Sequence, residues 1–123
     1  MLAVAAISVS ACSHSPPAPL SPPVTDRVHP ALPGKPGPQI VVEGTATWRT
    51  DHVGCATMMT DHGQMLRLVG QVATDHERAV FEGGPTQEHV RIVGYTFDPM
   101  TNATVCGSGL PFVAEKVTPT APQ

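Results

Sequence analysis

The chain of 123 residues has few aromatic side chains, which are Trp48, Tyr95, Phe81, Phe97 and Phe112. Proteins that hold single-stranded nucleic acid stack the bases on aromatic rings along a basic groove. Here the net charge is −3, and the acidic and basic residues are scattered singly with no basic stripe. The composition therefore excludes a nucleic-acid partner.

Common catalytic motifs are also missing. The sequence contains no P-loop and no dinucleotide-binding glycine pattern. Ser108 stands in Gly107-Ser108-Gly109, which lacks the Gly-x-Ser-x-Gly elbow of hydrolases. We therefore expect a protein that is not an enzyme and that needs no cofactor.

The N-terminus has an apolar run, residues 1–7, that is shorter than the roughly 20 residues of a membrane span. Small residues and a cysteine follow, in Val9-Ser10-Ala11-Cys12. This layout is typical of a secretory segment that ends in a lipobox, in which Cys12 is acylated and becomes the first mature residue. No Lys or Arg precedes Arg27, so the basic start of such a segment is missing. We expect residues 1–11 to be a signal segment clipped at its N-terminus; the alternative is an ordinary terminus with a chance cysteine.

An acylated Cys12 carries two or more acyl chains, which suffice for stable attachment to a membrane. The expected location is the extracytoplasmic side of a bacterial cell membrane. Behind Cys12, residues 13–39 hold nine of the fourteen prolines. Such a segment favours extended polyproline II, so we expect residues 12–39 to be a disordered, semi-stiff tether that could reach up to about 80 Å. A ligand for a Pro-binding groove is the alternative.

Residues 40–117 alternate apolar and polar side chains with a period of two, which predicts a mostly β domain. Strands are expected over residues 40–49, 54–59, 64–69, 89–97 and 110–117, with a tight turn at Asp61-His62-Gly63 and a bulge at Val93 or Gly94. A short helix capped by Thr74 or Asp75 should end at residue 81. Three strands, a helix and two strands predict a small five-stranded OB-like barrel, followed by a disordered tail at residues 118–123.

Two cysteines remain once Cys12 is assigned to the lipid anchor. In an exported domain, Cys55 and Cys106 most simply form a disulfide. Closing a loop of about 51 residues would stabilise the fold by roughly 4 kcal/mol in the chain-entropy description. No Cys-x-x-Cys motif occurs, so we predict a structural bond and not a redox-active pair.

The tripeptide Thr-Asp-His occurs three times, ending at His52, His62 and His76, and Glu88-His89 follows. Imidazoles accompanied by carboxylates could bind zinc or copper, so a metal-handling protein that uses these four histidines is the second hypothesis. However, Asp at turns is explained by its hydrogen bonds to the backbone, and all three tripeptides fall at predicted turns. Our first hypothesis remains a binding or scaffold domain without a metal.

Glycines, cysteines and strand residues form a recognisable series of motifs. They are Val42-Glu43-Gly44-Thr45, Gly54-Cys55, Gly63, Leu66-x-Leu68-x-Gly70, Val90-x-Ile92-x-Gly94 and Thr104-x-Cys106-x-x-Gly109-x-Pro111-Phe112-Val113. Together with the lipobox, this series resembles small actinobacterial-type envelope lipoproteins with a β-barrel domain. The resemblance implies a fold and a location and carries no catalytic residues. It leaves open whether the partner is an envelope protein or a small molecule.

Overall fold

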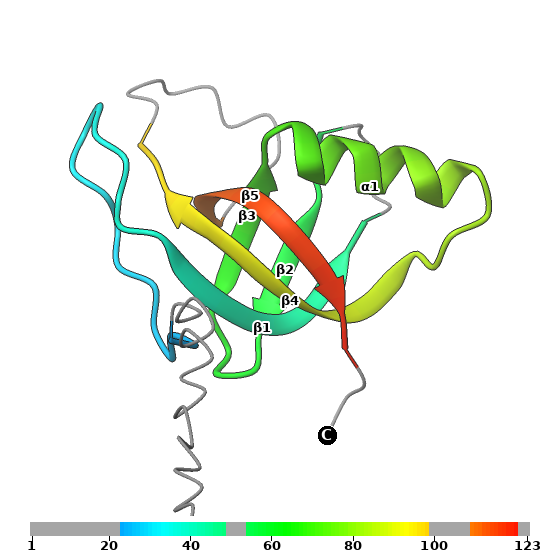
Figure 1. Ribbon diagram of the computed structural model, residues 1–123, viewed down its shortest axis with the longest axis horizontal. Helices are drawn as coiled ribbons and strands as arrows, with labels where there is room; N and C mark the ends of the chain where they lie inside the picture. The colour runs from blue at the N-terminus through cyan, green and yellow to red at the C-terminus, as the bar shows by residue number, and fades with distance from the viewer. Residues whose placement is uncertain (1–22, 49–53, 99–108, 121–123) are drawn as a thin grey trace, which may run out of the picture.

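The computed structural model describes residues 23–48, 54–98 and 109–120, and within these it forms a closed five-stranded barrel with one helix (Figure 1). The elements, in chain order, are β1 (Ile40–Thr47), β2 (Thr57–Thr60), β3 (Met65–Val69), α1 (Gln71–Phe81), β4 (Gln87–Thr96) and β5 (Leu110–Pro119). Around the barrel the strands follow the order β1-β2-β3-β5-β4, and β4 pairs again with β1. The predicted OB-like barrel is confirmed.

Barrel closure depends on two ladders. β1 and β4 are antiparallel over eight residue pairs, from Ile40 opposite Gly94 to Thr47 opposite Gln87. β3 and β5 are parallel, with Leu68 opposite Phe112, because the chain crosses through α1 and β4 between them. The register of β4 against β5 shifts between Val93 and Gly94, so the predicted bulge is confirmed.

The core lies inside the barrel, where inward side chains of every strand meet. The largest fully buried side chains are those of Trp48, Phe112, Met58, Leu66, Leu68, Ile92, Val42 and Val90. They come from alternate positions, as the period-two pattern predicts. Helix α1 packs on β5 and β3 and adds Ala73 to this core.

The helix begins earlier than its sequence suggests. Gly70 takes a φ of 100°, which lets the chain turn directly from β3 into α1 at Gln71. The expected caps Thr74 and Asp75 therefore lie inside the helix, and the Thr74 hydroxyl donates to the Gly70 carbonyl. The third Thr-Asp-His is thus helical, which corrects the expectation that it forms a turn.

β2 is shorter than predicted at its start because residues 54–56 bond to the helix. The backbone N–H groups of Gly54 and Ala56 donate to the two carboxylate oxygens of Glu77, at 2.8 and 3.1 Å. Glu77 is buried on α1, so this carboxylate ties the helix to the chain just before β2. At the other end of the domain, β5 continues to Pro119, two residues beyond the predicted end of the last strand.

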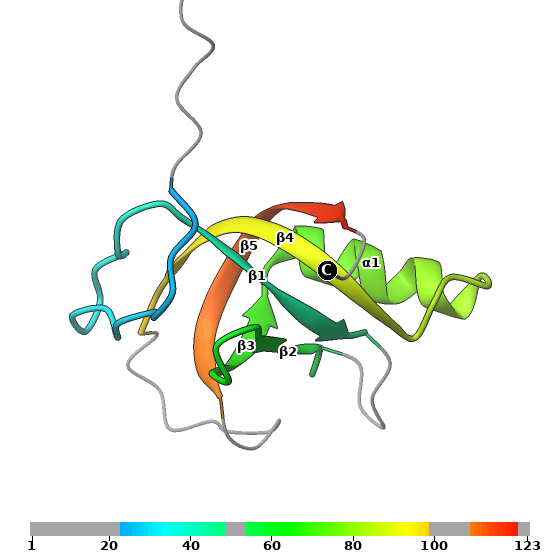
Figure 2. The ribbon, with the colours of Figure 1, turned by 90° about the horizontal axis from the view of Figure 1, so that it is seen from below.

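Residues 23–39 pack against the barrel, although their composition suggested a tether throughout. We call these residues the strap. Figures 1 and 2 show the strap at one end of the barrel and α1 at the other. Within the described residues, no helix is long and apolar enough to span a membrane.

Candidate binding groove

The strap is held by Val28, which is 2% exposed and belongs to the hydrophobic core. Its backbone N–H donates to Gln64 Oε1 and its carbonyl accepts from Gln64 Nε2, both at 2.8 Å. Gln64 follows the β2–β3 turn, so this turn satisfies both backbone groups of the buried residue. An apolar side chain and a remote glutamine therefore dock a Pro-rich segment that forms no strand of its own.

Further backbone contacts hold the strap on both sides of Val28. The Thr25 N–H donates to the Val41 carbonyl at 2.7 Å, and the Gly37 N–H donates to the Thr96 carbonyl at 2.8 Å. The Thr96 hydroxyl donates to the His29 carbonyl. These bonds join the strap to the start of β1 and the end of β4. Between the strap and these two strand ends lies a cavity, which Ile40 and Thr96 help to line.

This cavity, which we call the strap groove, has a volume of about 360 Å³. Its lining residues are Thr25, Arg27, His29, Pro30, Ala31, Leu32, Lys35, Pro36, Gly37, Pro38, Ile40 and Thr96. Most of these lining residues are apolar. Among the described residues that line the groove, Arg27 and Lys35 are cationic and none is Asp or Glu. The strap groove therefore combines apolar walls with two positively charged side chains.

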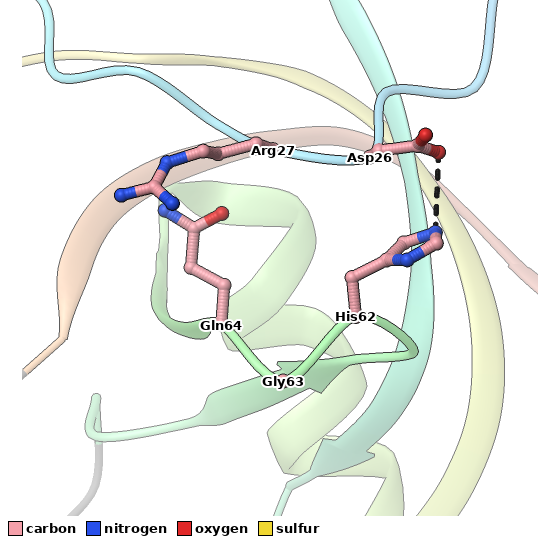
Figure 3. Close-up of a pocket in the computed structure, with 5 residues that line it drawn as sticks. All are labelled: Asp26, Arg27, His62, Gly63 and Gln64. Atoms are coloured by element: carbon pink, nitrogen blue, oxygen red, sulfur yellow. Dashed lines mark ion pairs between the residues drawn. The ribbon is translucent and has the colours of Figure 1, made fainter.

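Two smaller features border the strap groove. A cavity of about 220 Å³ shares Pro30, Ala31 and Thr96 with it and continues to Asp98 and the start of β5. On the other side, Arg27 also lines a polar hollow between the strap and the β2–β3 turn (Figure 3). Figure 3 shows Asp26 and His62 pointing toward each other across this hollow, and their side chains are 3.1 Å apart. The acid nearest to Arg27 in sequence is thus paired with a histidine.

The described histidines proposed as metal ligands lie apart, each with its own partner. His62 faces Asp26, and the His76 ring stacks on Trp48 with ring centroids 4.9 Å apart. His89 Nε2 lies 2.9 Å from Asp61 Oδ1, and its Nδ1 contacts the Thr120 hydroxyl. His52 lies outside the described residues. Within those residues, no three His, Cys, Asp or Glu side chains come together as a metal site.

The cysteine predictions fall largely outside the described residues. Cys12 and Cys106 are both outside them. Cys55 is buried just before β2 and is not a free thiol. Acylation of Cys12 and the pairing of Cys55 with Cys106 therefore stay predictions.

The strap groove was not predicted from the sequence, because the composition of residues 12–39 indicated a spacer. Val28 is one of several apolar residues in this segment, and its local pattern does not distinguish it from Val24 and Leu32, which are exposed. The burial of Val28 depends on Gln64, which is 36 residues away in the sequence. Local patterns do not report a contact of this kind.

The chain matches no known family model, and comparisons with curated proteins and with solved structures found no match either.

Proposed function

We propose that this protein is a lipoprotein of the bacterial envelope, anchored by Cys12, and that its barrel is a non-enzymatic binding domain. The strap groove is the observation that carries the binding function. At about 360 Å³ it falls within the size range of small-ligand sites, and its mix of apolar walls and a few polar groups is typical of them.

The lining indicates the chemistry of the ligand. Leu32, Ile40 and the prolines offer apolar surface, which favours a hydrocarbon part by removing it from water. Arg27 and Lys35 add positive charge that favours an anionic group. We therefore propose a small amphipathic acid as the ligand.

Anchoring and binding are tested separately. With a complete signal segment in a bacterial host, the wild-type chain should incorporate a fatty-acid probe and partition into detergent, and Cys12→Ser should abolish both. Equal labelling of the two chains would end the lipoprotein proposal.

Binding is tested on the full chain that carries Cys12→Ser, with dodecanoate as the probe. We expect the amide signals of residues 25–38 to shift on titration, while dodecanol, which lacks the charge, binds more weakly. Ala31→Phe should fill the strap groove and remove the shifts. Ala79→Phe places the same bulk on an exposed position of α1 and should leave them unchanged. If Ala31→Phe binds like its control, the strap groove is not the site.

The metal-handling alternative receives no support from the described residues, because His62, His76 and His89 have separate partners.

A further inference from the structure

Docking of the strap shortens the free part of the tether. If Cys12 is acylated, as the proposed function requires, only residues 12–22 separate the lipid anchor from the strap. Eleven residues span at most about 40 Å even when fully extended. This is about half the reach expected for the whole Pro-rich segment. The strap end of the barrel is therefore the end held close to the membrane.

That end has the surface chemistry of a membrane-facing site. Leu32 is 70% exposed in a tight turn, in which the Lys35 N–H donates to the Leu32 carbonyl at 3.0 Å. Arg27 and Lys35 are exposed nearby and line the strap groove. An apolar tip beside two cations fits an interface in which hydrocarbon lies below a layer of phosphates.

We propose that the strap groove binds an anionic phospholipid of the membrane that carries the tether, so that the barrel docks with the strap on the bilayer. Arg27 and Lys35 contact the lipid phosphate, and Leu32 enters the interface beside it. Acidic groups near this surface include Asp26, which faces His62, and Asp98, which lines the adjoining cavity. Glu115 accepts a hydrogen bond from Gln39 at the end of the strap. None of these three carboxylates lines the strap groove.

The expected binding is weak for a free chain and sufficient for a tethered one. Each basic residue near an anionic membrane surface strengthens binding about fivefold, so Arg27 and Lys35 together contribute about 25-fold. A short tether raises the effective concentration of the second contact to the millimolar range. Docking of the anchored protein therefore does not require high intrinsic affinity.

The test uses the full chain with Cys12→Ser, so that any membrane binding comes from the barrel and not from the acyl chains. The probes are vesicles of phosphatidylcholine alone and vesicles in which about one quarter of the lipid is phosphatidylglycerol. We expect sedimentation with the anionic vesicles only, and less of it as salt is raised.

Matched variants then locate the contact. Arg27→Gln with Lys35→Gln should weaken binding to anionic vesicles by about 25-fold. Arg78→Gln with Lys116→Gln removes the same charge from exposed positions outside the strap and should have little effect. Leu32→Ser should weaken binding, whereas Phe81→Ser should not, because Phe81 is exposed at the far end of α1.

Equal losses in the two charge variants, or equal binding to both kinds of vesicle, would overturn the lipid assignment. So would the absence of sedimentation when accessible anionic lipid reaches the millimolar range, the effective concentration that the tether supplies. If dodecanoate still shifts the strap signals in that case, the groove remains a binding site and only its lipid ligand is wrong. If the vesicles bind but Cys12 takes up no fatty-acid probe, the lipid site stands and the anchor is wrong.

Discussion

The side chain of Gln64 hydrogen-bonds both backbone groups of Val28, at 2.8 Å each, and so joins the strap to the β2–β3 turn. Val28 is buried, where unpaired backbone groups are costly. One amide side chain therefore lets an apolar residue of a Pro-rich segment enter the core. The strap groove exists because this contact holds one of its walls.

Gln64→Ala should release the strap. Two hydrogen bonds to a buried residue are lost, and the free energy of unfolding should fall by about 1–3 kcal/mol. Hydrogen exchange at Val28 should also rise while exchange in the β1–β4 ladder stays slow. Chemical denaturation and exchange measurements check the two effects.

The matched control is Gln71→Ala, because the Gln71 side chain donates to Asp75 on the exposed side of α1. This change should alter stability by less than about 0.5 kcal/mol. If Val28 is protected equally in the Gln64 variant and the control, Gln64 does not hold the strap.

The barrel was predictable from sequence because its evidence is local. Alternation along each strand identified the buried faces, and the switch of the apolar face after Ile92 indicated the bulge at Val93 or Gly94. The start of α1 was predicted too late in the chain because the expected signal was a side-chain cap. The helix instead begins after Gly70, which has a positive φ and no capping side chain. The strap groove was missed because it needs Gln64 and Val28 together, and neither residue alone has an unusual pattern.

Glu77→Ala should be strongly destabilising. Glu77 is 4% exposed, and its carboxylate accepts the N–H groups of Gly54 and Ala56. Removing it costs two hydrogen bonds and leaves the buried Ala56 N–H without its acceptor, which predicts a loss of about 3 kcal/mol. Glu77→Gln, which keeps one acceptor oxygen, should lose less. Equal stability of Glu77→Ala and the exposed control Glu82→Ala would contradict this role.

Gly94→Ala should disrupt the bulge between β4 and β5. A Cβ at Gly94 would lie 2.0 Å from the Val113 carbonyl oxygen, so the two strands must separate. We expect a loss of about 3 kcal/mol or more. Gly63→Ala is the contrast, because its Cβ meets nothing within 4 Å and only the φ of +86° is unfavourable, which predicts about 1 kcal/mol. A smaller effect at Gly94 than at Gly63 would show that the strands adapt easily.

The disulfide prediction is tested on the exported chain. If Cys55 and Cys106 are bonded, thiol counting after unfolding without reductant should find neither residue reactive. Reduction should then lower the melting temperature, with a loss of stability of up to roughly 4 kcal/mol in the entropy description. Two reactive thiols at these positions, in protein from an oxidising compartment, would refute the pairing.

His76 and His62 have different surroundings, so replacing them should change the free energy of unfolding by different amounts. His76 stacks on Trp48, so His76→Ala should lower the free energy of unfolding by about 0.5–1.5 kcal/mol. His62 is exposed beside Asp26, and His62→Asn should change it by less than about 0.5 kcal/mol. Trp48 is the only tryptophan in the chain, so its emission reports unfolding directly and should also change in the folded His76 variant.

Thermal melts of the wild type with and without zinc or copper test the metal-handling hypothesis. A metal that binds only the folded chain stabilises it by about 2.7 kcal/mol at a hundredfold excess over its dissociation constant. Because His62, His76 and His89 have separate partners, we expect no such rise in the wild type. A metal-dependent rise that disappears in the variant with His52, His62 and His76 all changed to Asn would restore the metal-handling hypothesis.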